Sequence, residues 1–399
     1  MRKFIKSVKA FFVTNWQVII GAIIVFTLVF GLFGYRLGDL TSGLSSNELQ
    51  FVESSLSSEK ILDNPTNIPQ KGLIFAIDRL GLISNFSVRF ISALLSMLTI
   101  LLIFQLLRKW HTTRVTIFSC VLLTVSSWFV GVGRLATAQI LLVLGVTLII
   151  YVAEIIDDKN KHDSVKTILL VALGGLSLYI PGLIWLFLGM LTLKRKSIIS
   201  TITNLKFYER ILGCLVVFIL LFPVIVLSIS DIEFLKNILV IPVNFEPTEW
   251  LRRLVVIPIY LFAQGPLDPS INLSRLPLLD IFSSVLFLFG LYAYYFKQNL
   301  TRTKLIGVLL AVSAIIIAID GHYFMPLLIP LVFIVIASGV ELLIQQWLTI
   351  FPKNPLAQKL GVSLVVITIM LTGFYHIQRY FVAWTGSPET HEEFIHSLD

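Results

Sequence analysis

The sequence has few charged residues and only two cysteines. Of its 399 residues, 14% are charged and 56% are hydrophobic, whereas a soluble domain carries about 25% charged residues. So few charges exclude a soluble globular protein. The cysteines, Cys120 and Cys214, both lie in apolar runs. We therefore expect neither a disulfide framework nor a cysteine metal site.

Nucleotide-binding motifs are also missing. The sequence contains no GxxxxGK[ST] motif and no strand-flanked GxGxxG motif. The segments that we predict to be cytoplasmic are too short for a nucleotide-binding domain. This excludes an ATP-driven pump. We therefore expect any catalytic residues to lie at the outer face.

The sequence does contain apolar runs long enough to cross the ~30 Å hydrocarbon core of a bilayer. These runs predict an all-α integral membrane protein with about eleven transmembrane helices. The first run follows a basic stretch but has no small-residue cleavage site, so we interpret it as a retained helix and not as a signal peptide. The predicted spans are residues 16–35, 87–107, 115–132, 135–154, 167–180, 182–193, 211–229, 279–296, 304–319, 323–347 and 360–377.

The net charge of +8 could suggest nucleic-acid binding, but its distribution indicates membrane topology. With the N-terminus inside, the cytoplasmic segments hold 20 of the 31 Lys and Arg residues, and 17 of the 23 acidic residues lie outside. Basic residues are expected on the cytoplasmic side. We therefore predict a multi-pass protein of the cell (cytoplasmic) membrane with a cytoplasmic N-terminus, an outer C-terminal tail at 378–399 and no nucleic-acid partner.

One pair of spans needs a special interpretation. Lysines flank the run 167–193 on both sides, yet 27 residues are too few for two full spans. Pro181 and Gly182 interrupt the run, and both residues disfavour a continuous helix. We expect two short, half-depth helices that return the chain to the cytoplasm. The alternative is one tilted span, which would invert the topology of everything downstream.

The chain is predicted to be a single membrane domain, 1–399, with two long outer loops at 36–86 and 230–278. In the first loop, Leu49, Val52 and Leu56 fall on one helical face, as in a helix that lies at the membrane surface. A second short helix is expected at about 71–80. In the second loop, Glu249–Ala263 is expected to form an interfacial or partly re-entrant helix.

The first outer loop carries the candidate catalytic carboxylates. Glu48 and Asp39 could each act as a general base or bind a metal ion. A divalent metal is possible, although no ligand set can be recognised. The alternative for Glu48 is structural, because Ser45-x-x-Glu48 matches a capping box, in which the carboxylate only begins a helix.

Candidate cations lie near the same level of the membrane. Arg134 occupies an outer turn of a few residues, where a charge is costly without a function or a partner. Its alternative role is to reach the lipid headgroups with its long side chain. Arg89 at the start of the second span is open to the same two interpretations, and His322 lies in another short outer turn.

Four segments resemble polyprenyl-phosphate-sugar-dependent glycosyltransferases of the GT-C fold, similar to protein O-mannosyltransferases and lipid A aminoarabinose transferases. They are Gly43-Leu44-Ser45-Ser46-Asn47-Glu48, Arg89-Phe90-Ile91-Ser92-Ala93-Leu94-Leu95, Ser126-Ser127-Trp128-Phe129 with Arg134-Leu135-Ala136, and His322-Tyr323-Phe324-Met325-Pro326. The first stands where the family has an Asp-Glu pair. This sequence has Asn47 in place of the Asp.

The resemblance implies transfer of a sugar from a polyprenyl-phosphate carrier to a lipid, glycan or protein acceptor at the outer face. It implies an inverting attack with Glu48, or Asp39 in its place, as the base. Cations must stabilise the leaving lipid phosphate. The residues that we expect to bind the lipid phosphate are Arg134, Arg89, His322, Tyr323 and Arg36.

Two other functions stay open. A transporter or lipid flippase would carry ionisable residues deep within its spans and inverted repeats, but Glu341 is the only acidic residue well inside a run and no repeat is evident. A non-catalytic GT-C relative, serving as a binding or assembly subunit, is compatible with the loss of the family Asp at Asn47.

Overall fold

The computed structural model describes residues 16, 19–21, 23–242, 246–296 and 299–398. The predicted N-terminal basic stretch lies outside these residues, as do positions 17, 18 and 22 of the first predicted span. Within the described residues the chain is helical, and the single β-bridge joins Leu44 to His396. This confirms the all-α class.

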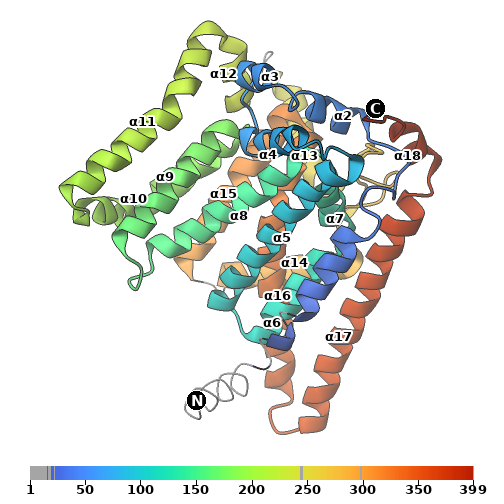
Figure 1. The fold of residues 1–399 in the computed structure, drawn as a ribbon. Helices are drawn as coiled ribbons and strands as arrows, with labels where there is room; N and C mark the ends of the chain where they lie inside the picture. Colours follow the sequence, from blue (N-terminus) through green and yellow to red (C-terminus); the bar gives the residue numbers. More distant parts are fainter. Residues whose placement is uncertain (1–15, 17–18, 22, 243–245, 297–298, 399) are drawn as a thin grey trace, which may run out of the picture.

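The predicted apolar runs form long helices (Figure 1). Six helices of the described residues are long and apolar enough to cross a membrane: α5 (Asn85–Trp110), α8 (Gln139–Ile156), α11 (Phe207–Ser230), α15 (Leu300–Asp320), η1 with α16 (His322–Leu327 and Leu328–Ile350), and α17 with η2 (Pro355–Gln378 and Arg379–Trp384). A seventh would be the pair α6 (Thr113–Val125) and α7 (Ser127–Arg134), bent by 61° at Ser126. Ile19–Gly34 and α14 (Ile281–Phe296) are apolar but shorter. The predicted count of eleven is therefore not confirmed.

The hairpin of α9 (Asp163–Tyr179) and α10 (Leu183–Asn204) corrects one prediction. At 1.5 Å per residue these helices measure about 25 and 33 Å, so they are neither short nor half-depth. They pack side by side. Their turn reaches the predicted outer loops, because Tyr179 accepts a hydrogen bond from the Asn67 backbone (2.6 Å) and Gly182 donates one to Ile238 (2.9 Å). The alternative of one tilted span is also wrong.

The length estimate failed because it ended the second helix at its first basic residues. The buried Lys194 instead forms an ion pair with the partly exposed Asp157 at the end of α8, and α10 continues as a helix for ten more residues. At the turn, Gly182 adopts φ +75°. This left-handed conformation suits glycine and reverses the chain.

Short helices gather at one end of the bundle, which we call the loop face (Figure 1). They are α2 (Ser46–Glu53), α3 (Ser58–Asp63), α4 (Ile68–Arg79), α12 (Ile232–Leu239) and α18 (Pro388–Glu393). Helix α13 (Pro247–Phe262) packs along α15. Both predicted outer loops and the C-terminal tail therefore share one end of the molecule.

The closest contact between two helices is that of α14 with α16. Helices α14 and α16 approach so closely that a methyl group at Gly339 would collide with the Leu286 carbonyl, and one at Gly290 with the Val335 carbonyl. Small residues allow helix backbones this proximity in membranes. Helices α8 and α16 are mostly buried, whereas α11 is almost wholly exposed at the edge.

Candidate functional site

Glu48 and Arg89 form a buried ion pair beneath the loop face. Their side chains are 0% and 3% exposed. Arg89 donates from Nε to Glu48 Oε1 at 2.9 Å and from Nη2 to Oε2 at 2.8 Å. This two-pronged geometry is the strong form of an arginine–carboxylate contact. The same guanidinium also donates to the Gly43 carbonyl at 2.8 Å.

Two backbone groups complete the surroundings of Glu48. Ala136 N donates to Oε1 at 2.7 Å, and Ser45 N donates to Oε2 at 3.0 Å. Glu48 N in turn donates to Ser45 Oγ at 3.3 Å, so both hydrogen bonds of the predicted capping box are present. Each carboxylate oxygen thus accepts two hydrogen bonds. This geometry makes Glu48 a structural link between the first loop, α5 and the chain after α7, while its catalytic role stays a prediction.

Arg134 is also buried, at 2% exposure. Its guanidinium donates to the carbonyls of Leu32, Tyr35 (2.8 Å) and Arg36 (3.4 Å), where the first apolar helix ends. A cation is favourable at a helix C-terminus. The Phe381 ring, 5.0 Å from the guanidinium carbon, covers another side. These contacts favour a structural role.

The other predicted site residues are more accessible. Asp39 and Arg36 are exposed, and Arg36 Nη2 donates to the Asp39 carbonyl at 3.1 Å. His322 is half exposed and lies 3.3 Å from Asp268. Tyr323 is 41% exposed. The structure brings Glu48 and Arg89 together, and no contact joins them to His322 or Tyr323.

The C-terminal tail covers the Glu48–Arg89 pair. Leu44 and His396 exchange backbone hydrogen bonds of 2.8 and 3.2 Å. Phe394 is fully buried, with its ring 5.8 Å from the Arg89 guanidinium carbon. Glu393 accepts a hydrogen bond from Ser46 Oγ at 2.9 Å. The tail therefore closes the first loop over the ion pair.

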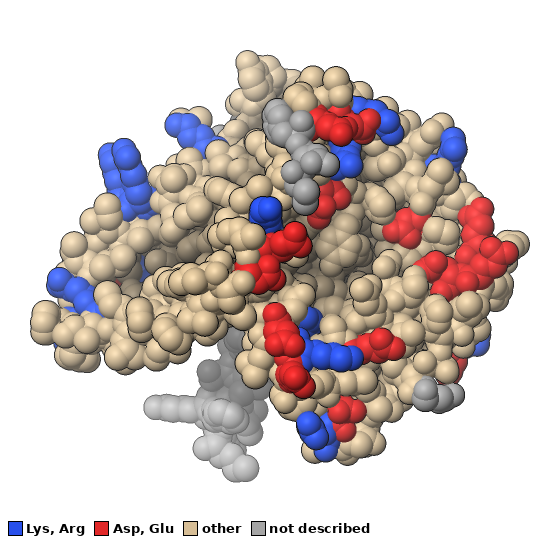
Figure 2. Space-filling view, turned by 90° about the horizontal axis from the view of Figure 1, so that it is seen from above, with Lys and Arg blue, Asp and Glu red and all other residues tan. Residues whose placement is uncertain are grey.

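Figure 2 views the molecule from the loop face, where acidic side chains surround a central hollow. No group of three or more His, Cys, Asp or Glu side chains able to hold a metal lies among the described residues. The possible divalent metal therefore finds no ligand cluster in this part of the chain.

Lys71 is a functional candidate that the sequence analysis missed. It lies in α4 and is only 3% exposed. Its ammonium donates to the Asn64 carbonyl at 2.8 Å, and no carboxylate of the described residues forms an ion pair with it. Burial lowers the pKa of Lys71, because desolvation disfavours the charged form. An ammonium has three donors, so this one can bind an anion.

A long apolar groove begins at α4, the helix that carries Lys71. It lies between α9 and α11 and has an empty volume of about 1470 Å³. Ile68, Pro69 and Tyr179 line one end, at the loop face, and Ser164 and Glu209 line the other. The walls between these ends are almost entirely apolar. The groove therefore suits a long hydrocarbon chain.

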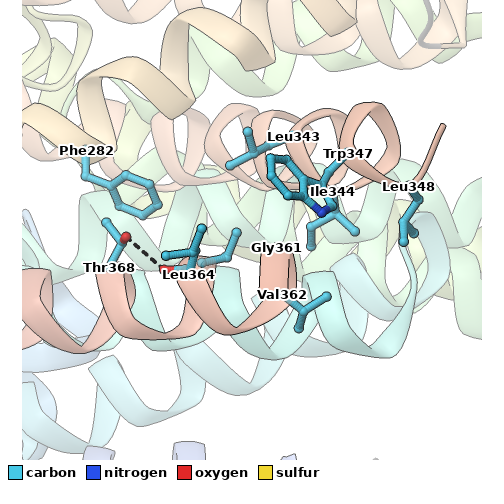
Figure 3. Close-up of a pocket in the computed structure, with 10 residues that line it drawn as sticks. Phe282, Leu343, Ile344, Trp347, Leu348, Gly361, Val362, Leu364 and Thr368 are labelled. Atoms are coloured by element: carbon cyan, nitrogen blue, oxygen red, sulfur yellow. Dashed lines mark hydrogen bonds between the residues drawn. The ribbon is translucent and has the colours of Figure 1, made fainter. Parts of the chain in front are cut away.

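Two other features are structural. The pocket between α16 and α17, about 620 Å³, is lined by apolar groups around Trp347, and its Thr368 hydroxyl is bonded to the Leu364 carbonyl (Figure 3). Glu341, the acidic residue inside a run, lies 2.8 Å from His111 Nδ1. Neither offers the ionisable pathway that a transporter requires.

The fold is similar to that of a solved membrane protein of known structure. The structure of ArnT from Cupriavidus metallidurans bound to undecaprenyl phosphate superposes with a TM-score of 0.55 at 12% identity, covering 95% of this chain and 78% of that one. The apo structure of the same protein gives 0.53 at 12% identity, with coverage of 96% and 78%. ArnT is a lipid A aminoarabinose transferase.

The family model of dolichyl-phosphate-mannose-protein mannosyltransferase matches residues 73–226, from α4 to α11. This segment contains Arg89 and Arg134 but not Glu48, Asp39 or Lys71. No curated protein sequence matches the chain. The resemblance predicted from short motifs is thus confirmed by both the family model and the fold.

Proposed function

We propose that this protein is a membrane glycosyltransferase that moves a sugar from a polyprenyl-phosphate carrier to an acceptor at the loop face. The observation that carries the proposal is the apolar groove between α9 and α11, which ends at Ile68 and Pro69 of α4. The same helix carries the buried Lys71, which forms no ion pair within the described residues. An isoprenoid chain is apolar, as the groove walls are, and its terminal phosphate is an anion that an ammonium can bind. ArnT, which has the same fold, binds undecaprenyl phosphate.

The chemistry requires a cation at the leaving group. As the bond between sugar and phosphate breaks, negative charge grows on the lipid phosphate, and a cation already in place stabilises it. Arg89 is already paired with Glu48, and Arg134 already donates hydrogen bonds to the carbonyls at a helix end. We therefore assign the phosphate to Lys71. His322, together with Tyr323 and Arg36, supplies further polar groups at the loop face.

The acceptor hydroxyl requires a base. We propose that Asp39 removes this proton during an inverting attack, because its carboxylate is exposed and receives no hydrogen bond from a described side chain. Glu48 has the matching position in the family motif, yet Arg89 and two backbone amides occupy its oxygens. The proposal needs no metal-dependent step.

Binding of undecaprenyl phosphate to the purified protein in nanodiscs tests the carrier site. Lys71→Met should weaken binding at least tenfold, whereas Lys60→Met, at an exposed lysine of the same loop, should leave it unchanged. Equal affinity of wild type and Lys71→Met would move the phosphate elsewhere. No binding by the wild type would overturn the proposal.

Turnover of radiolabelled polyprenyl-phosphate sugars tests the catalytic step. Asp39→Asn should reduce transfer about 10²–10⁴-fold, the usual worth of general base catalysis, without loss of carrier binding. Transfer at the wild-type rate would exclude Asp39. Carrier binding by the wild type without transfer to any lipid, glycan or protein acceptor would indicate a non-catalytic GT-C relative.

A further inference from the structure

Three buried side chains of α4 and of the chain around the start of α8 have an acceptor oxygen without a protein donor. These atoms are Gln70 Oε1, Thr137 Oγ1 and Gln139 Oε1. The residues are 0%, 9% and 5% exposed. Gln70 precedes Lys71 in α4, and the other two lie just before and at the start of α8. Gln70 contacts the Thr137 backbone, and Gln139 follows two residues later. Buried acceptors are nearly always hydrogen-bonded, so three without a donor on these two segments need an explanation.

The orientation of both amides is fixed by their surroundings. Gln70 Nε2 donates to the Thr137 carbonyl at 3.1 Å and to Ser92 Oγ at 3.0 Å. Gln139 Nε2 donates to the Tyr323 carbonyl at 3.4 Å. A carbonyl oxygen only accepts, so the amide nitrogen must face it. Rotating either amide by 180° would place two oxygens against each other, so the amide oxygens are the atoms without a partner.

The chemistry of these atoms points to a ligand rich in hydroxyl groups. Two amide oxygens accept hydrogen bonds, and the Thr137 hydroxyl both donates and accepts. An anion finds no counterpart in two amide oxygens, whereas the hydroxyl groups of a sugar can donate to all three atoms. A site that hydrogen-bonds a substrate hydroxyl rejects analogues that lack it, because its own buried groups would then be left unpaired.

We infer that Gln70, Thr137 and Gln139 bind hydroxyl groups of the sugar carried on the lipid phosphate and determine which sugar is accepted. The inference rests on the proposed function, because it places the sugar beside the phosphate at Lys71. The three atoms are closed off from solvent. Entry of the sugar therefore requires α4 to move away from the start of α8.

The test compares binding of undecaprenyl phosphate with binding of the same carrier loaded with mannose, glucose or arabinose. The wild type should bind at least one loaded carrier about tenfold or more tightly than the bare carrier. Thr137→Val should abolish this preference and leave affinity for the bare carrier unchanged. Thr137→Ser, which retains the hydroxyl, should retain the preference.

Thr137→Val is informative because its hydroxyl has no protein partner to lose. A folding defect is therefore not expected, and thermal unfolding of the variant should match the wild type. Gln139→Leu should act in the same direction, with Gln50→Leu at an exposed site of α2 as its control.

The outcomes separate this inference from the proposed function. Equal binding of bare and loaded carriers by the wild type would overturn the sugar site and leave the carrier site intact. An unaltered preference in both Thr137→Val and Gln139→Leu would also overturn it. Failure of the wild type to bind any carrier would overturn the proposed function itself.

Discussion

The Glu48–Arg89 pair provides the sharpest test of the structure. Glu48→Gln removes the charge from a fully buried carboxylate that accepts four hydrogen bonds. The amide nitrogen of Gln cannot accept a hydrogen bond. Whether this nitrogen replaces Oε1 or Oε2, the two groups that donate to that oxygen lose their acceptor. At Oε2 these donors are Ser45 N and Arg89 Nη2. Each unsatisfied buried group costs about 1–3 kcal/mol.

A second estimate gives a similar magnitude. Removing one partner of a buried ion pair leaves an uncompensated charge and typically costs about 3–5 kcal/mol. We therefore expect Glu48→Gln to lower the free energy of unfolding by about 3–5 kcal/mol. The capping box alone would predict about 1 kcal/mol, the usual effect of losing an N-terminal cap.

Equilibrium unfolding by SDS in mixed micelles, followed by far-UV circular dichroism, measures this difference. Glu53→Gln, at an exposed position of the same helix, should change stability by less than about 0.5 kcal/mol. Adding Arg89→Met to Glu48→Gln should recover part of the loss, because it removes the unpaired cation. A loss below about 1 kcal/mol, or a strictly additive double variant, would refute the reasoning.

Three further predictions concern other parts of the molecule. Burial lowers the pKa of Lys71 below the usual lysine value of 10.5, so between these two pH values the unfolded chain binds more protons than the folded chain. The free energy of unfolding of the wild type should therefore rise with pH through this window. Lys71→Met should remove this rise when unfolding in micelles is measured against pH. Gly339→Ala should cost about 1–3 kcal/mol through overpacking against α14, whereas Gly307→Ala, in open space, should not lower the thermal midpoint. Phe394→Ala should increase hydrogen exchange at residues 43–48, because the tail no longer covers this segment; unchanged exchange would contradict this.

The long helices could be predicted because each depends mainly on a local property. Helix α5 was expected at 87–107 and spans Asn85–Trp110, since hydrophobicity alone keeps such a segment in the bilayer. The lengths of the helices in the α9–α10 hairpin could not be predicted from hydropathy, because Lys194 within α10 forms an ion pair with Asp157, 37 positions away. Hydropathy ends a helix at the first charge, whereas an ion pair allows the helix to continue.

The candidate site was only partly predictable. The capping box at Ser45 and Glu48 is local in sequence, and the structure contains it. The partnership of Glu48 with Arg89 joins residues 41 positions apart and could not be read from spacing. The burial of Lys71 could not be predicted, because the first loop packs against the α9–α10 turn through contacts between distant residues, such as Asn67 with Tyr179.

The buried cations near the loop face differ in the partners of their charge, and this difference distinguishes residues with a structural role from a residue that can bind a ligand. Arg89 meets a carboxylate, and Arg134 meets the carbonyls at a helix end. Both charges are satisfied within the protein, so a bound phosphate would have to compete with these partners. Within the part of the chain that the structure describes, the Lys71 ammonium has one neutral carbonyl as its partner, and its charge is costly until an anion arrives. A site that is unfavourable when empty gains most from its ligand, and for this reason we place the phosphate at Lys71 and not at the arginines that the motifs single out.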